Sequence, residues 1–224
     1  DFAKSMIKFM KDEYGVDPVY EAQAGEKETD FRSFLLKAKA ANPDAIVLSG
    51  LVDETVRALK QSYEVGIPKS VARVANSVAS KVEVPTNAGK AAVGVTYAAA
   101  FAASDKRPIA KKFVKKIKDK YGVVPGHDFS QMQDLLDMLR PALEKAQLKF
   151  SGNLASDRNA VRDSIASITN FTGLASGPIG FCAAGSPECR DGNKTPVMIE
   201  YTKGGKNWKT KVAGTVTFNP SAGL

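Results

Sequence analysis

Apolar and polar positions between Thr29 and Pro68 follow the order helix, turn, strand, loop, helix. The run Ala45–Leu48 is short and wholly apolar, a pattern typical of a parallel strand that is covered on both faces. Asn42 precedes Pro43, and a residue before proline avoids the helical conformation. The first helix of this segment is therefore expected to end just before the strand begins.

The loop after this strand leads into the second helix of the segment. Ser49-Gly50 closes the strand, and Asp53 is placed to cap the helix that follows. Gly66-Ile67-Pro68 ends that helix with a glycine followed by a proline. The segment is thus an αβα unit of the kind that builds parallel sheets.

The same periodicities predict further elements on both sides of this unit. Helices are expected over residues 2–14, 108–121, 129–145 and 158–168, and strands over 16–22, 70–75, 91–101 and 196–202. Helices and strands that alternate at this pace indicate an α/β fold with a doubly wound parallel sheet.

Ligands of such sheets bind beyond the carboxyl ends of the strands, which here are the residues after Leu48, Ala75 and Tyr97. The candidate ligand-binding residues at two of these ends are Leu51, Val52, Asn76 and Ser77. We expect them to line one side of a surface groove. Leu51 and Val52 would form an apolar wall there, although ordinary loop packing explains these two residues equally well.

Two helices carry apolar stripes at helical spacing. The stripe of the first helix predicts core packing and consists of Phe2, Met6, Phe9 and Met10. The stripe of the 129–145 helix has to pack on a sheet and consists of Met132, Leu135, Leu136, Leu139 and Leu143.

The 224 residues carry a formal net charge of +8, which raises the question of an anionic partner. The densest basic run is KKFVKKIKDK at residues 111–120. Phe113, Ile117 and Tyr121 recur every four residues and predict one buried stripe, with the lysines on the remaining faces. No aromatic residues interleave with the lysines on that basic face, so the pattern argues against nucleic-acid binding.

The two cysteines, Cys182 and Cys189, lie in a segment rich in Gly, Ser and Pro. A zinc site needs more ligands, and the only histidine, His127, lies in a different segment and is expected in a surface turn. A Cys182–Cys189 disulfide is the better interpretation, and it implies an oxidising compartment. No metal and no cofactor is expected.

Sequence motifs of common enzymes are absent. The chain contains no G-x-G-x-x-G, no Walker loop, no G-x-S-x-G and no H-E-x-x-H. A single histidine also rules out most histidine-based metal sites and triads. The sequence therefore predicts a protein that is not an enzyme, and no catalytic residue is assigned.

Six short fragments occur along the chain in the order in which one family carries them: TDF at 29–31, ANPDAI at 41–46, AGKAAVG at 88–94, YGVVP at 121–125, ALEKA at 142–146 and GPIGF at 177–181. Together they resemble the periplasmic substrate-binding proteins of ABC transporters, of the branched-chain amino acid (type I) family. Each fragment is weak alone, and the order of all six makes the resemblance specific.

The resemblance implies a solute receptor that closes two lobes around a small-molecule ligand, an amino acid or a carboxylate, and then docks on an ABC permease in the membrane. It also implies a monomer that is periplasmic, secreted or lipid-anchored and made with a signal peptide. Residues 1–102 would be the core of the second lobe, 103–181 the C-terminal part of the first lobe, and 182–224 the hinge return and terminal strands. The chain then resembles a fragment that lacks most of the N-terminal lobe.

One position departs from the family. Amino-acid-binding relatives have an acidic residue near the end of the strand that follows Ile67-Pro68, where it meets the ligand ammonium, and this chain has Asn76. An amide pairs less well with an ammonium than a carboxylate does, so carboxylates, amides and aromatic acids become comparable candidates. Two other functions remain open: a ligand-sensing receptor domain of the same fold, and a flavodoxin-like enzyme or regulator.

Overall fold

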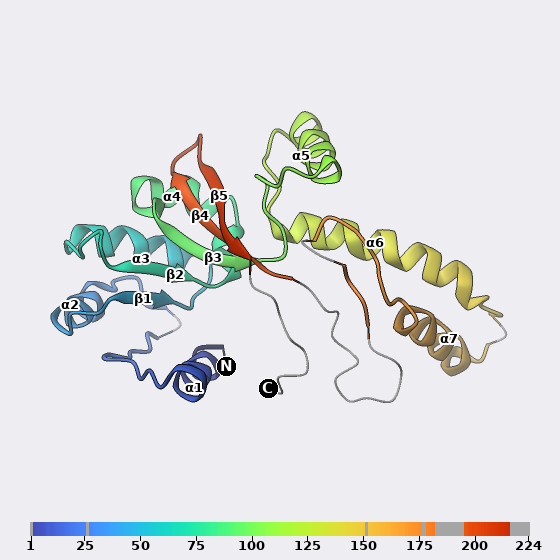
Figure 1. Ribbon diagram of the computed structural model, residues 1–224, viewed down its shortest axis with the longest axis horizontal. Helices are drawn as coiled ribbons and strands as arrows, with labels where there is room; N and C mark the ends of the chain where they lie inside the picture. Colours follow the sequence, from blue (N-terminus) through green and yellow to red (C-terminus); the bar gives the residue numbers. More distant parts are fainter. Residues whose placement is uncertain (1, 26, 151, 176–177, 182–194, 216–224) are drawn as a thin grey trace. The chain divides into compact units, whose positions relative to one another are not determined.

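The chain folds into two compact units in a computed structural model that describes residues 2–25, 27–150, 152–175, 178–181 and 195–215. Unit 1 comprises Asp1–Ala98 and Ile199–Lys211, and unit 2 comprises Ala99–Met198 and Val212–Leu224. The chain therefore crosses between the units three times (Figure 1). Cys182 and Cys189 lie outside the described residues, so their pairing stays a prediction.

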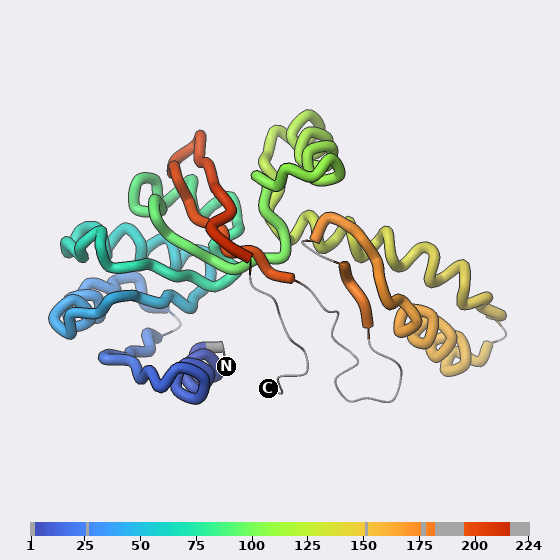
Figure 2. The backbone as a smooth tube through the Cα atoms, in the orientation of Figure 1, coloured from blue at the N-terminus to red at the C-terminus, as the bar shows by residue number. Residues whose placement is uncertain are grey.

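Unit 1 is built on a five-stranded sheet with the order β1-β2-β3-β4-β5. Its strands, three of which run slightly past its limits, are β1 (Ala45–Leu48), β2 (Ala72–Ala75), β3 (Val95–Ala99), β4 (Val197–Lys203) and β5 (Lys209–Thr215). Its helical elements are α1 (Phe2–Tyr14), α2 (Arg32–Ala40), α3 (Val52–Glu64), η1 (Ser77–Ser80), α4 (Glu83–Ala88) and η2 (Gly89–Ala92). Figure 2 shows the C-terminal β4–β5 ribbon beside β3, although roughly a hundred residues separate them in sequence.

The three N-terminal strands are parallel, which confirms the predicted α/β class. In the register of β1 and β2, Ala45 lies opposite Ala72 and Leu48 lies opposite Ala75. β2 and β3 pair in the same direction, with Ala75 opposite Tyr97. The turn before β1 forms as predicted, since α2 ends at Ala40 and Asn42 takes a left-handed φ of 50°.

The centre of unit 1 is an aromatic group that joins β3 to the C-terminal strands. The rings of Tyr97 and Tyr201 lie 5.3 Å apart, and Trp208 meets Tyr201 edge-on at 5.9 Å. The Tyr201 hydroxyl is buried and donates to the carbonyl of Ala79 in the 3₁₀ turn η1, which follows β2. Burial raises the pKa of Tyr97 to about 12, and burial raises the pKa of Tyr201 as well.

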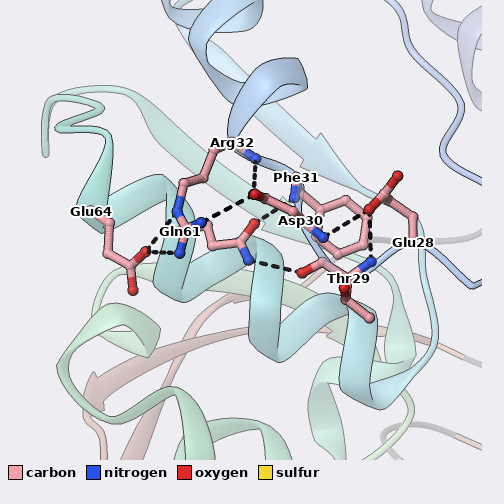
Figure 3. Close-up of polar contacts among 7 residues, drawn as sticks. All are labelled: Glu28, Thr29, Asp30, Phe31, Arg32, Gln61 and Glu64. Atoms are coloured by element: carbon pink, nitrogen blue, oxygen red, sulfur yellow. Dashed lines mark hydrogen bonds and ion pairs between the residues drawn. The ribbon is translucent and has the colours of Figure 1, made fainter.

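A buried amide fastens the segment before α2 to α3 (Figure 3). Gln61 of α3 is only 9% exposed, and its Oε1 accepts from the backbone N–H of Phe31 at 2.5 Å. Its Nε2 donates to the carbonyl of Thr29 at 3.0 Å. Arg32 adds an exposed ion pair to Glu64, which contributes little because both partners are in water. Gln61 therefore fixes the approach of residues 29–31 to α3.

The described residues of unit 2 form three helices: α5 (Pro108–Tyr121), α6 (His127–Ala146) and α7 (Leu154–Ala166). α6 packs on α7, while the buried residues of α5 join a small core with Phe101 and Leu174. Asp134 of α6 is 2% exposed, and its carboxylate accepts from the backbone N–H groups of Leu174 and Ala175 at 2.7 and 2.8 Å. This carboxylate holds the loop at residues 173–175 against α6.

Some predicted elements are wrong or shifted. Residues 16–22 form no strand, because Pro18 removes a ladder donor and no neighbouring strand pairs with the segment in the described residues. The strand predicted from Ala91 begins only at Val95, after a 3₁₀ turn over 89–92. The short helix α4 was not predicted, since its sequence EVPTNA has no helical period.

Several burial predictions are also wrong. β1 is not covered on both faces, since Val47 is 42% exposed and Ile46 and Leu48 are only partly buried. In α1, Phe9 and Met10 are exposed instead of packed in a core. Tyr121 is exposed, although Phe113 and Ile117 of the same stripe are buried as predicted.

α6 also differs from expectation in two respects. His127 is the first residue of this helix, with a side chain mostly buried beside Asp128, and is not a surface turn residue. Most of the apolar stripe of α6 is exposed in the described structure, its exposed members being Met132, Leu135, Leu136 and Leu143. The helix itself forms where the stripe predicts it, and it continues through Pro141.

We predict that Gln61→Ala lowers the free energy of unfolding by about 1–3 kcal/mol, because it leaves the Phe31 N–H and the Thr29 carbonyl without their partner. Urea unfolding followed by circular dichroism measures the change. Gln133→Ala is the matched control, since Gln133 bonds only the exposed Asp137. A loss from Gln61→Ala no larger than the control's would contradict the role of Gln61.

The buried tyrosines predict a loss of stability at high pH. The pKa of Tyr97 is about 12 in the folded chain, against roughly 10 for an unfolded tyrosine. Below pH 10, Tyr97 is protonated in both states and does not change the free energy of unfolding with pH. Between pH 10 and 12 it ionises only in the unfolded chain, which lowers the free energy of unfolding by about 1.4 kcal/mol for each pH unit. Thermal unfolding from pH 8 to 11.5 should show this slope, and Tyr97→Phe should reduce it. Tyr14→Phe removes an exposed hydroxyl and should leave the slope unchanged. Equal slopes in both variants would contradict the assignment of this pH dependence to Tyr97.

Candidate functional site

A hollow of about 320 Å³ opens in unit 1 where the carboxyl ends of β1 and β2 meet. Because Leu48 lies opposite Ala75, the two strands end at the same level, and the loops that follow leave the sheet together. The hollow is lined by Ser49, Gly50, Leu51, Glu54, Asn76 and Val78. This is the edge at which parallel α/β sheets bind ligands.

Asn76 ties the two loops together. Its backbone N–H donates to the carbonyl of Leu48 at 3.2 Å, which continues the ladder by one bond. Its side-chain Nδ2 donates to the carbonyl of Gly50 at 3.1 Å. Asn76 Oδ1 is buried and accepts no hydrogen bond within the described residues. The residue therefore has a structural role and also carries a spare acceptor.

Glu54 brings a carboxylate to the same hollow. It is in the first turn of α3, and its Oε2 accepts from the backbone N–H of Leu51 at 2.7 Å. This bond caps the helix, which Asp53 was predicted to do. Asp53 was predicted to be the capping residue before the helix, but α3 already begins at Val52, and Leu51 takes that position.

Two of the four predicted residues line the hollow. Leu51 is 70% exposed there, and Asn76 is half-buried. Val52 and Ser77, the first residues of α3 and η1, stand next to lining residues without lining the hollow themselves. The segment after Tyr97, the third predicted strand end, contributes no lining residue. Whether any of these residues binds a ligand stays a prediction.

Glu54 is the lining residue whose functional potential the sequence did not reveal. Its signal was its spacing: a Glu three residues after the residue that precedes a helix can turn back toward the helix start. Ser49 and Gly50 were recognised only as the end of the strand, and in the structure both line the hollow, where the Gly50 carbonyl accepts from Asn76.

Two side-chain acceptor groups lie at this hollow, the carboxylate of Glu54 and the Oδ1 of Asn76. The N-terminus of α3 adds a partial positive charge, and the cap by Glu54 offsets it. The hollow is thus suited to a ligand group that donates hydrogen bonds, above all an ammonium. Within the described residues, no group of three His, Cys, Asp or Glu side chains could hold a metal ion.

A second hollow, of about 360 Å³, lies within unit 2 between α6 and the end of α7. Lys145 donates to Ser167 Oγ there at 2.7 Å, and Ser167 donates to the carbonyl of Ser164. Lys145 and Ser167 are thus bonded to other lining residues, whereas the buried Ser164 Oγ has no partner among the described residues. This hollow is not at the end of parallel strands. We regard the hollow at β1 and β2 as the candidate site.

Comparison with known proteins gives one family match and many structural matches. The family described as periplasmic binding protein matches residues 2–188. No curated protein matches the chain. The leucine binding protein LivK from Thermotoga maritima is 26% identical, with a TM-score of 0.71 over 88% of this chain and 51% of that one.

Two other solved structures are similar in fold. The branched-chain amino acid transporter substrate binding protein LivJ from Streptococcus pneumoniae, in complex with isoleucine, is 23% identical, with a TM-score of 0.78 over 96% of this chain and 57% of that one. A solute binding protein of an ABC transporter from R. palustris, in complex with benzoate, is 15% identical, with a TM-score of 0.71 over 97% of this chain and 57% of that one. This chain spans about half the length of these structures.

We predict that Asn76→Asp destabilises the fold more than Asn76→Ala does. Alanine removes the bond to Gly50 and should lower the free energy of unfolding by about 0.5–1.5 kcal/mol. Aspartate instead places a charged acceptor against the Gly50 carbonyl and should cost more. Ser77→Ala, at an exposed neighbour, should change the free energy by less than about 0.5 kcal/mol. Urea unfolding tests the order, and an Asn76→Asp variant as stable as the native chain would contradict it.

Proposed function

This chain belongs to the periplasmic binding protein family, as its sequence predicts, and from that premise we propose that it serves as the solute-binding component of an ABC importer. The protein acts on the outer side of the cytoplasmic membrane. There it binds a small amino acid or a related carboxylate and delivers it to an ABC permease. The proposal is supported by the isoleucine and benzoate complexes of structurally similar proteins. The family match also favours binding over the flavodoxin-like enzyme or regulator.

The observation that carries the proposal is the acceptor-lined hollow at the ends of β1 and β2. Asn76 stands where amino-acid-binding relatives are expected to have an acidic residue. Glu54, near the neighbouring strand end, supplies a carboxylate instead. A charge-assisted bond from a ligand ammonium to Glu54 favours an amino acid over an acid that has no cationic group. The exposed side chain of Leu51 offers an apolar surface for the ligand side chain.

No helix among the described residues combines the length and the apolar character that crossing a bilayer requires. The expected location outside the cytoplasm follows from the family, as does the permease partner. We expect the ligand-bound protein to act as a monomer and without catalysis.

We predict that Glu54→Gln weakens the binding of leucine or isoleucine by roughly 10- to 100-fold, in line with about 1.5–3 kcal/mol for a hydrogen bond to a charged group. Glutamine keeps an oxygen to accept from the Leu51 N–H, so the helix cap is preserved. Isothermal titration of the protein made from its complete reading frame measures the dissociation constants.

Two controls separate the ammonium contact from a general disturbance. 4-Methylpentanoate, which is leucine without its ammonium, should bind Glu54→Gln no more weakly than the native protein. Glu64→Gln, at an exposed position near the other end of α3, should leave leucine binding unchanged. Equal losses for leucine and 4-methylpentanoate, or no loss for leucine, would overturn the role of Glu54.

A further inference from the structure

α5 concentrates most of the excess positive charge of the chain on one helix. Its 14 residues contain six lysines and one acidic residue, Asp119, a net charge of +5 out of +8 for the whole chain. All six lysines are exposed, at positions 111, 112, 115, 116, 118 and 120. The proposed transport function makes no use of this lysine face.

The fold determines which way the lysine face points. Ala110, Phe113 and Ile117 are buried in the core of unit 2, so the opposite side of α5 must face solvent. On a helix, residues three or four apart are neighbours, and the lysines therefore form two adjacent rows. The lysines extend over about 14 Å of helix, from Lys111 to Lys120. Asp119 pairs with Lys115 and leaves the other lysines of both rows without an acid on this helix.

We propose that the lysine face of α5 binds the anionic headgroup surface of a lipid bilayer. A planar membrane matches a flat, two-row array of point charges without requiring a shaped pocket. Each lysine near an anionic surface strengthens binding by roughly fivefold, and clusters of four to eight basic residues are typical of such contacts.

The composition of the face favours lipid over a macromolecular partner. Protein interfaces are enriched in arginine and aromatic residues and depleted in lysine, and every basic residue of this face is a lysine. Proteins that bind single-stranded nucleic acid stack bases on aromatic side chains, and the aromatic residue of α5 that lies near the face, Tyr121, is at its very end. A nonspecific electrostatic contact with a surface fits lysine best.

The contact is independent of the ligand site. α5 belongs to unit 2, and the acceptor-lined hollow belongs to unit 1. The lysine face would keep the protein close to the membrane that holds its permease. This role near the permease rests on the proposed function, whereas binding to vesicles does not. The Glu54→Gln variant should therefore bind vesicles like the native protein.

The test is co-sedimentation of the protein from its complete reading frame with vesicles. Binding is expected to vesicles of phosphatidylcholine with 30% phosphatidylglycerol at low salt, to fall steeply as salt screens the charges, and to be absent with phosphatidylcholine alone. Changing three unpaired lysines to glutamine, Lys111→Gln, Lys112→Gln and Lys116→Gln, should weaken binding by roughly 100-fold. The corresponding triple change to arginine preserves the charge and should bind like the native protein.

A matched control removes the same charge elsewhere. Lys37→Gln, Lys60→Gln and Lys206→Gln alter three exposed lysines of unit 1 and should change vesicle binding by less than about threefold. Equal losses in both triple variants would overturn the proposal, because net charge alone would then explain binding. Equal binding to neutral vesicles, or tighter lysine-dependent binding to duplex DNA or polyglutamate than to anionic vesicles, would overturn it as well.

Discussion

The in-register pairing of β1 with β2 is the constraint on which the candidate site depends. Leu48 opposite Ala75 makes the two strands end at the same level, so the loops that follow face each other. Asn76 then reaches the carbonyl of Gly50, and Glu54 turns back to the N–H of Leu51. A slip of one residue in this pairing would separate Asn76 from Gly50 and turn each side chain of the strand to the opposite face of the sheet. Backbone pairing therefore positions the polar groups of the hollow before any ligand is present.

In each unit, one buried side chain of a helix forms hydrogen bonds to two backbone groups of a distant loop. Gln61 satisfies one donor and one acceptor of residues 29–31, and Asp134 satisfies two donors of residues 174–175. In each case one helix residue takes up two backbone groups of a loop that is 30 to 41 residues away in sequence. Loops without regular structure leave backbone groups unpaired, and a buried loop therefore needs such partners. These two contacts explain how polar side chains come to lie inside the core.

The charged and apolar surfaces are arranged by the same packing. The buried side of α5 joins a core with Phe101 and Leu174, which leaves its lysines in water. α6 also buries one side, that of Asp134 and Ala142, while Leu135 and Leu136 stay exposed on another. The exposure of a side chain thus follows from which side of its helix meets a neighbour, and the apolar character of the residue does not decide it alone.

The sequence by itself determined the parallel α/β class, the strands at 45–48 and 72–75, the long helix of unit 2 and the family. Local signals suffice for these features: an unbroken apolar run, an Asn-Pro turn and helical spacing depend only on neighbouring residues. The strand-end rule also found Leu51 and Asn76, because the ends of parallel strands always meet at one edge. Tertiary structure alone decided that β1 is an edge strand with Val47 exposed and that Glu54 and Asn76 share one hollow. Those outcomes depend on contacts between segments that are distant in sequence, and hydrophobic periodicity carries no information about which segments will become neighbours.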